Sequence, residues 1–195
     1  TINMSAIGDA LLAETSAEFG PRIEAVVVYN SNPVAVAPDS LKVVQGFKRD
    51  DLFTVVLEHF MTDTADHADI ILPATTQLEH LDVHTAYGHT DLMFNEPAIA
   101  PLGLSKSNTQ IFRELAQRMG FKDDCFLQSD QAMAREAIDW DKLGVTFDAL
   151  RARGWAPLPL PDMPMADGQF ATPDGRADAR GATYVPNRES VLSAP

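Results

Sequence analysis

Three short apolar runs, separated by segments of helical pattern, constrain the fold most strongly. The runs lie within residues 23–29, 53–57 and 70–72, and the first contains Ala-Val-Val-Val-Tyr with no polar alternation. Such a run is typical of a central parallel strand that is covered on both faces. Strands and helices that alternate at this spacing predict parallel strands joined by right-handed crossovers. We therefore expect an α/β fold with a mostly parallel sheet.

The segments between and after these runs carry helix signals. Apolar positions at helical spacing predict a helix within residues 2–16, and Asp39 or Ser40 is the expected N-cap of a second helix. That helix is expected to bury one apolar face: Leu41, Val44 and Phe47. Thr62 and Asp63 can cap a short helix before the third run. Further helices are expected to start at Ser107 or Asn108, ending at Gly120, and at Ser129.

Two regions depart from this alternation. Residues 82–100 fit either a hairpin or an extended loop, because Asn95-Glu96-Pro97 blocks a regular helix there. From residue 156 the chain is rich in proline, which is typical of a linker. We therefore expect a domain over residues 1–155 and a linker and tail over 156–195, in which residues 170–176 form a strand and a turn.

Composition excludes several classes of partner. The 195 residues carry a net charge of −13, whereas nucleic acids and anionic membrane surfaces bind basic faces. No run of ~18 apolar residues exists, so we expect no membrane insertion. A phosphate-containing ligand stays compatible with an acidic chain, because helix N-termini and local side chains can bind one.

Polar residues follow each predicted strand, where ligands of parallel α/β sheets bind. Asn30 and Asn32 come after the first strand, and Glu58-His59 after the second. The amides offer donors and acceptors to a ligand, but they also favour turns. The carboxylate can accept from an amine or hydroxyl pair and the imidazole can contact a phosphate, while capping and surface roles stay open for both.

No catalytic or metal-binding constellation is complete. His80 and His84 have the spacing of one helix face, but the pattern His-Glu-x-x-His is absent, so a ligand-lining or solvated role is favoured over a metal site. The single cysteine, Cys125, excludes a disulfide within the chain and a cysteine-based cluster. Its acidic neighbours disfavour a reactive thiolate, and we expect a partly buried structural thiol.

Several segments, in order, resemble the molybdopterin oxidoreductases of the dimethyl-sulfoxide-reductase superfamily, which includes formate dehydrogenases, nitrate reductases and biotin-sulfoxide-type reductases. The matching segments are Val-Val-Val-Tyr-Asn-Ser-Asn-Pro at 26–33 with Ala-Pro-Asp at 37–39, residues 60–79, Glu-Pro-Ala-Ile-Ala-Pro at 96–101, residues 106–120 and Phe-Ala-Thr-Pro-Asp-Gly-Arg at 170–176. Each segment is a weak signal alone, and the ordered set is specific.

The resemblance implies a Rossmann-like three-layer domain, here partial, with an irregular C-terminal extension. In the family this domain binds the guanosine and pyrophosphate parts of a molybdopterin guanine dinucleotide, two of which hold the molybdenum. By position, the family's cofactor-contacting residues match Asn32, Glu58, His59, His80 and Asn108. The resemblance assigns no catalytic residue and no metal ligand to this chain.

Departures from the family pattern limit the implied activity. The segment with the molybdenum ligand has no match, Cys125 is in the wrong place for it, and the Gly usual after Glu79 is replaced by His80. The N-terminal iron–sulfur motif and the C-terminal β-barrel are also unmatched. We therefore expect a non-catalytic fragment of a molybdenum-dependent oxidoreductase, with any iron–sulfur cluster in a missing N-terminal part.

The expected partners are the remainder of the parent chain and an electron-transfer subunit. Family members occur in the cytoplasm and the periplasm, so the sequence assigns no compartment. The alternative function is a non-catalytic protein-interaction domain that kept the α/β fold and lost the ligand.

Overall fold

A computed structural model describes residues 2–161, 163 and 165–177 of the chain. Within this range the chain forms two compact units: unit 1 comprises residues 2–75 and 103–108, and unit 2 comprises residues 76–102 and 109–177. Each unit has its own core and is described by itself. The expected division of the chain at residue 155 stays a prediction.

Unit 1 is built on a three-stranded parallel sheet. Its strands are β1 (Ala25–Tyr29), β2 (Phe53–Glu58) and β3 (Ile70–Pro73), in the order β1-β2-β3. The register places Val27 beside Val55, and Val55 beside Ile70. The predicted α/β fold with a parallel sheet is confirmed, and each of the three apolar runs forms a strand.

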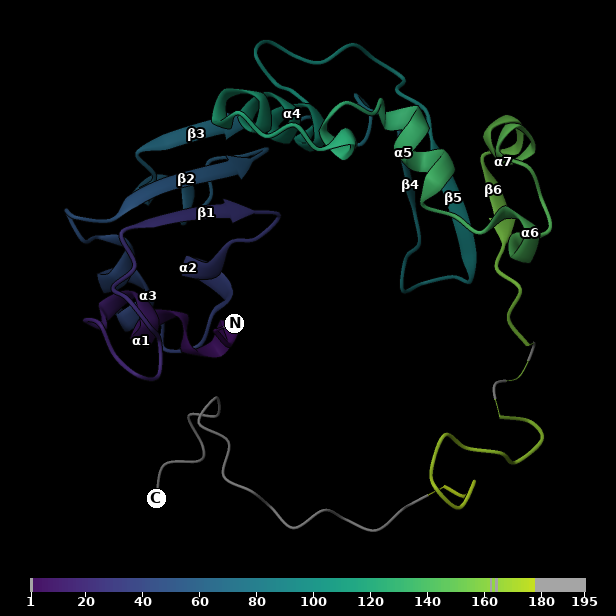
Figure 1. The fold of residues 1–195 in the computed structure, drawn as a ribbon, viewed down its shortest axis with the longest axis horizontal. Helices are drawn as coiled ribbons and strands as arrows, with labels where there is room; N and C mark the ends of the chain where they lie inside the picture. The colour runs from purple at the N-terminus through teal and green to yellow at the C-terminus, as the bar shows by residue number, and fades with distance from the viewer. Residues whose placement is uncertain (1, 162, 164, 178–195) are drawn as a thin grey trace. The chain divides into compact units, whose positions relative to one another are not determined.

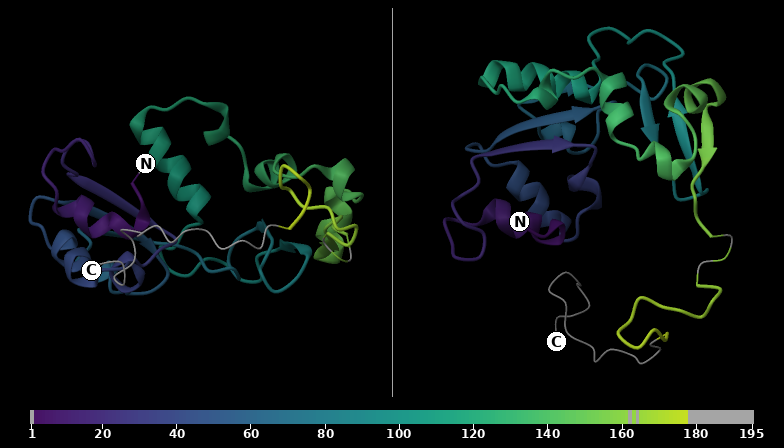
Figure 2. Two further views of the ribbon diagram at one scale, coloured as in Figure 1. Left: turned by 90° about the horizontal axis from the view of Figure 1, so that it is seen from below. Right: turned by 45° about the vertical axis from the view of Figure 1, so that its right-hand side comes forward.

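The helices of unit 1 lie on one face of this sheet (Figure 1), and the right-hand view of Figure 2 shows the same arrangement. They are η1 (Met4–Ala6), α1 (Ile7–Leu12), α2 (Pro33–Val36), α3 (Ser40–Phe47) and η2 (Ala65–His67). Their buried residues include Leu11, Val34, Val43 and Phe47, which pack with Val28 and Val56 of the sheet. This face holds the core of unit 1.

Two details of the prediction for unit 1 are wrong. β1 is an edge strand instead of a central one, and Val27 and Tyr29 are 53% and 45% exposed. The expected buried face of α3 is also displaced. Leu41 is 77% exposed, whereas Val43 and Gly46 are buried with Phe47, because α3 turns its small residue toward α1.

Helices α1 and α3 approach closely at glycine. A Cβ atom added at Gly46 would lie 2.6 Å from Cβ of Leu11, and one added at Gly8 would lie 2.9 Å from Cβ of Lys42. Real Cβ atoms do not come this close to another atom. The close contact between the two helices therefore requires a residue without a side chain at both positions.

Thr54 gives the first testable prediction. It lies in β2 with 0% exposure, and its hydroxyl has no hydrogen-bond partner among the described residues. Since a buried unpaired hydroxyl costs ~1–3 kcal/mol, Thr54→Val is expected to stabilise unit 1 by about 1 kcal/mol. Hydrogen exchange of β2 amides measures this change. Slower exchange is expected, and faster exchange would show that the hydroxyl has a partner.

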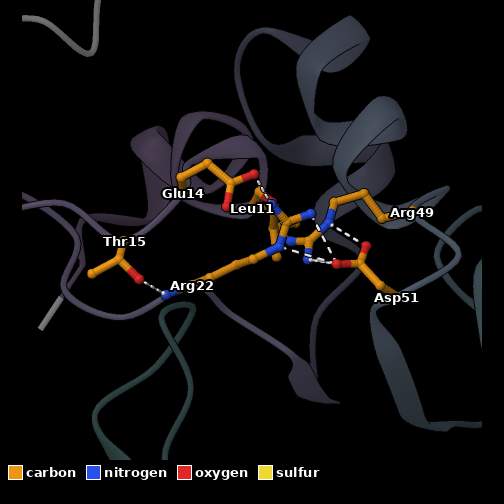
Figure 3. A network of polar contacts seen from close by, with 6 residues as sticks. All are labelled: Leu11, Glu14, Thr15, Arg22, Arg49 and Asp51. Carbon is orange, nitrogen blue, oxygen red and sulfur yellow. Dashed lines mark hydrogen bonds and ion pairs between the residues drawn. The ribbon is translucent and has the colours of Figure 1, made fainter.

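An arginine–aspartate cluster joins the connections that precede β1 and β2 (Figure 3). Arg49 donates to both carboxylate oxygens of Asp51, at 3.0 and 2.8 Å, and to the backbone carbonyl of Leu11. Arg22 donates to the same carboxylate from Nε at 3.0 Å and also pairs with Glu14. The cluster ties the end of α1 to the amino-terminal ends of the strands, opposite the edge where their carboxyl ends lie.

Asp51 makes the stability of unit 1 sensitive to acid. The guanidinium of Arg49, followed by that of Arg22, holds the pKa of the Asp51 carboxyl well below its usual range, against partial desolvation. A lowered folded-state pKa gives stability that is present above the unfolded-state pKa of about 3.9 and is lost as the pH falls. We therefore expect the unfolding temperature of unit 1 to fall less steeply between about pH 5 and pH 2 in Asp51→Asn than in the unchanged chain. Amide exchange of unit 1 measures this temperature. An unchanged slope would contradict this role.

Unit 2 is an antiparallel sheet with helices. Its strands are β4 (Asp82–His84), β5 (Asp91–Asn95) and β6 (Trp155–Pro157), in the order β4-β5-β6. Its helices are α4 (Asn108–Met119, whose first residue belongs to unit 1), η3 (Asp124–Phe126), α5 (Asp130–Glu136), α6 (Trp140–Leu143) and α7 (Phe147–Arg153). The core contains Leu92, Phe94, Ala134, Phe147, Leu150 and Ala156. Of the two conformations predicted for residues 82–100, the hairpin forms.

A buried carboxylate closes the segment that carries this hairpin. Glu79, 8% exposed, accepts hydrogen bonds from the backbone and hydroxyl of Thr76, at 2.7 and 2.8 Å, and from the backbone of Leu102 at 2.6 Å. The amide of Asn95 donates to the carbonyls of Gln77 and His80. The two ends of residues 76–102 are thus joined directly.

The C-terminal part carries little regular structure. β6 extends past residue 155, and Ala156 is buried in the core of unit 2. Residues 170–176 form the predicted turn, with the backbone of Gly175 donating to Thr172, but not the predicted strand. Residues 178–195 of the expected tail lie outside the described residues.

Candidate cofactor-binding edge

The carboxyl ends of β1, β2 and β3 meet at one edge of unit 1. Four of the five predicted binding residues belong to this unit: Asn32, Glu58, His59 and Asn108. They come from the loop after β1, the end of β2 and the start of α4. Parallel sheets bind ligands at this edge, because the loops there diverge and leave polar groups free to converge on a ligand.

Asn32 connects the loops after β1 and β2. Its side-chain oxygen accepts from the hydroxyl of Thr64 at 2.7 Å and from the backbone of Thr64 at 3.1 Å. Its amide nitrogen donates to Asp63 at 3.3 Å. The hydroxyl of Thr64 in turn accepts from the backbone of Val34. Sequence reasoning missed Thr64, which is fully buried. The bond to Asp63 uses one of the two N–H groups of the Asn32 amide.

Glu58 and His59 lie where β2 ends. The Glu58 carboxylate accepts from the backbone N–H of His59 at 2.7 Å, and its side chain is 16% exposed. Nε2 of His59 lies 2.9 Å from the carbonyl oxygen of Thr75. A carbonyl only accepts, so Nε2 carries the proton of this bond. In neutral His59 the other nitrogen, Nδ1, is therefore an acceptor.

Asn108 begins α4 beside the loop after β1. Its amide nitrogen lies 3.5 Å from the side-chain oxygen of Asn30, and its own side-chain oxygen is buried without a hydrogen-bond partner among the described residues. Asn30 has a positive φ of 50°, a left-handed conformation that asparagine tolerates better than most residues. Residues far apart in sequence thus bring two amides together at this edge.

His80, the fifth predicted residue, belongs to unit 2. Its backbone carbonyl accepts from the amide of Asn95 at 2.7 Å. This bond fixes the main chain at His80 relative to the hairpin. Its assignment to the cofactor stays a prediction.

Three further observations concern the rest of the chain. Among the described residues no cluster of three or more His, Cys, Asp or Glu side chains has the arrangement of a metal site. Cys125 is exposed, so the expectation of a partly buried thiol is wrong; the short η3 does not bury it. Over the same residues, none of the helices is long and apolar enough to span a membrane.

Comparisons with known proteins assign the family. A sequence model described as molybdopterin oxidoreductase matches residues 9–118, more than half of the chain. The chain therefore belongs to the molybdopterin oxidoreductase family, whose members use a molybdenum–pterin cofactor. It is 38% identical, over 91% of its length, to the probable oxidoreductase YoaE of Bacillus subtilis (strain 168). Over 90% of its length it is 29% identical to the dimethyl sulfoxide/trimethylamine N-oxide reductase of Rhodobacter capsulatus.

The fold has a counterpart among solved structures. Acetylene hydratase from Pelobacter acetylenicus matches 90% of the chain at 25% identity, with a TM-score of 0.64. The chain spans 26% of YoaE, 21% of the Rhodobacter reductase and 24% of the hydratase. It thus spans about a quarter of the length of these relatives.

Proposed function

We propose that this chain is the part of a molybdenum-dependent oxidoreductase that binds the guanosine and pyrophosphate portion of molybdopterin guanine dinucleotide, and that it is not catalytic by itself. The observation that carries the proposal is the convergence of Asn30, Asn108 and the Glu58-His59 pair at the carboxyl edge of the sheet. This edge is where nucleotides bind in sheets of this kind.

The residues of this edge fit a guanine nucleotide chemically. Guanine presents adjacent N–H donors, which need acceptors, and the unpartnered side-chain oxygen of Asn108 is an acceptor. The Glu58 carboxylate can accept from an exocyclic amine or from ribose hydroxyls. His59 can face phosphate when protonated, and His80 is proposed for the same kind of contact. When bound, the molybdenum–pterin group supplies the redox chemistry.

The names of the relatives support a binding role over a catalytic one. Related proteins include a reductase and a hydratase, and both share this region. A region common to different reactions is better suited to hold a shared cofactor than to select the chemistry. Substrate, electron-transfer partner and any iron–sulfur cluster would then belong to the rest of the parent protein.

Calorimetric titration of the chain with GDP, used as a fragment of the cofactor, tests the proposal. We expect binding that Asn108→Ala weakens ~10-fold, which corresponds to the loss of about 1.4 kcal/mol. Asn3→Ala is the matched control, because Asn3 only caps η1. Absence of GDP binding, or equal weakening by both variants, would contradict the proposal and favour an interaction domain without a nucleotide.

A further inference from the structure

His59, at the carboxyl edge of the sheet in unit 1, has one ring nitrogen that is bonded and one that is not. Nε2 donates to the carbonyl oxygen of Thr75 at 2.9 Å, so this nitrogen keeps its proton whether or not the ring is charged. Nδ1 makes no hydrogen bond among the described residues, and the carboxylate of Glu58 lies 4.0 Å from it. A proton that His59 gains therefore goes to Nδ1, on a side chain that is 37% exposed.

The charged side chains that adjoin this edge are mainly acidic. The loop after β1 and the start of α4 bring uncharged amides. Residues 103–108 run beside the chain after β3, because the backbone of Lys106 bonds to Pro73 and Thr75. The strand ends, loops and short helix that adjoin the edge carry these titratable side chains: Tyr29, Glu58, Asp63, Asp66, His67 and Lys106. A phosphate group that binds here thus meets more carboxylates than cations.

The protonation state of His59 changes what this edge offers to a phosphate group. A phosphate diester carries no proton and only accepts hydrogen bonds, and Nδ1 of neutral His59 is an acceptor as well. Protonated His59 presents an N–H donor with a positive charge, and such charge-assisted bonds are among the strong ones. An anion beside an imidazole favours its charged form, and by linkage the charged form binds the anion more tightly.

We propose that His59 takes up one proton at Nδ1 when a nucleotide with a pyrophosphate group binds at this edge, so that binding strengthens as the pH falls. The inference rests on the function proposed above and adds a pH dependence to it. The proton comes from the solvent and returns to it when the ligand leaves. The bond from Nε2 to Thr75 is compatible with both states, so the ring gains its charge without turning.

Calorimetric titration of the chain with GDP-mannose tests the proposal. The pyrophosphate of this ligand is esterified at both ends, as in a dinucleotide, whereas the terminal phosphate of GDP itself gains a proton near pH 6. We expect binding about 5-fold tighter at about pH 6 than at about pH 8, the range in which histidine changes its charge. At about pH 7 the heat of binding is expected to differ between two buffers of different ionisation enthalpy, since the buffer releases the proton that the chain takes up.

Two glutamine variants assign the proton to a residue. His59→Gln keeps an N–H group for the carbonyl of Thr75 but gains no charge, so its affinity is expected to be the same at both pH values. His89→Gln is the matched control, because His89 also lies within 4.0 Å of a carboxylate, that of Asp91, but belongs to unit 2. This variant is expected to keep the full pH dependence. Amide exchange of β2 confirms that unit 1 is folded in both variants.

Three results would overturn the proposal without affecting the nucleotide-binding role. One is equal affinity of the unchanged chain at both pH values, with the same heat in both buffers. Another is tighter binding at the higher pH, which would mean that Nδ1 accepts from a hydroxyl or an N–H of the ligand. The third is a pH dependence that persists in His59→Gln, because another group would then take up the proton. Absence of binding at both pH values would contradict the nucleotide-binding role as well.

Discussion

Asn32→Ala is expected to destabilise unit 1 by about 2–4 kcal/mol, the largest effect among the single substitutions considered. The substitution removes the oxygen that accepts from both the backbone and the hydroxyl of Thr64, a residue with 0% exposure. Buried donors left unpaired cost ~1–3 kcal/mol each, although the hydroxyl can rotate to reduce the loss. Amide exchange of β2 measures the change in unit 1, because both tryptophans, Trp140 and Trp155, lie in unit 2.

Asn32→Asp separates the two bonds of this side chain. The variant keeps an oxygen that accepts from Thr64. It replaces the amide nitrogen that donates to Asp63 by a carboxylate oxygen, so that two carboxylates face each other. We expect a smaller loss of about 1 kcal/mol, since repulsion between exposed carboxylates is weak in water. If Asn32→Ala costs no more than Asn32→Asp, the bonds to Thr64 do not stabilise the loop.

Gly46→Ala is expected to destabilise unit 1 by about 1–3 kcal/mol. In an exposed helix interior the same substitution stabilises by about 1 kcal/mol, because alanine is the better helix former. At Gly46 the new Cβ lies 2.6 Å from Cβ of Leu11, an atom fixed to its own helix, so α1 must move away. Overpacking of this kind outweighs helix propensity.

Gln45→Ala is the matched control on the same helix. Gln45 is exposed, and its substitution is expected to change stability by less than about 0.5 kcal/mol. Thermal unfolding followed by amide exchange of β2 compares the two variants. A stabilising Gly46→Ala would show that α1 and α3 separate at no cost.

The strands were predictable because their apolar runs are local signals. Residues 53–57 and 70–72 read as strands in the sequence and are strands in the structure. The partial exposure of β1 was not predictable from the run itself, because the exposure of a strand depends on which other elements pack against it. The face of α3 was misjudged for a related reason: Gly46 carries no apolar side chain, so hydrophobic spacing does not reveal that it faces α1.

The candidate site was predictable in its location more than in its contacts. Polar residues after strands indicated the edge, and Asn32, Glu58 and His59 lie there. Pairing across the sequence was hidden, because the contact between Asn108 and Asn30 and the contact between Asn32 and Thr64 depend on tertiary structure. Thr64 carries no signal beyond its place in a polar loop. Similarly, the bonds of Glu79 to Thr76 and Leu102 follow from no local pattern.

The bonds of Glu79 have a consequence for the segment that they close. Because one carboxylate joins Thr76 to Leu102, the two ends of residues 76–102 are held next to each other. Asn95, within the hairpin, donates to the same segment, and Leu92 and Phe94 lie in the core of unit 2. The hairpin of β4 and β5 is thus held at both of its ends and along its buried side, so loss of the Glu79 carboxylate is expected to loosen the two ends of residues 76–102 before it disturbs the core of unit 2.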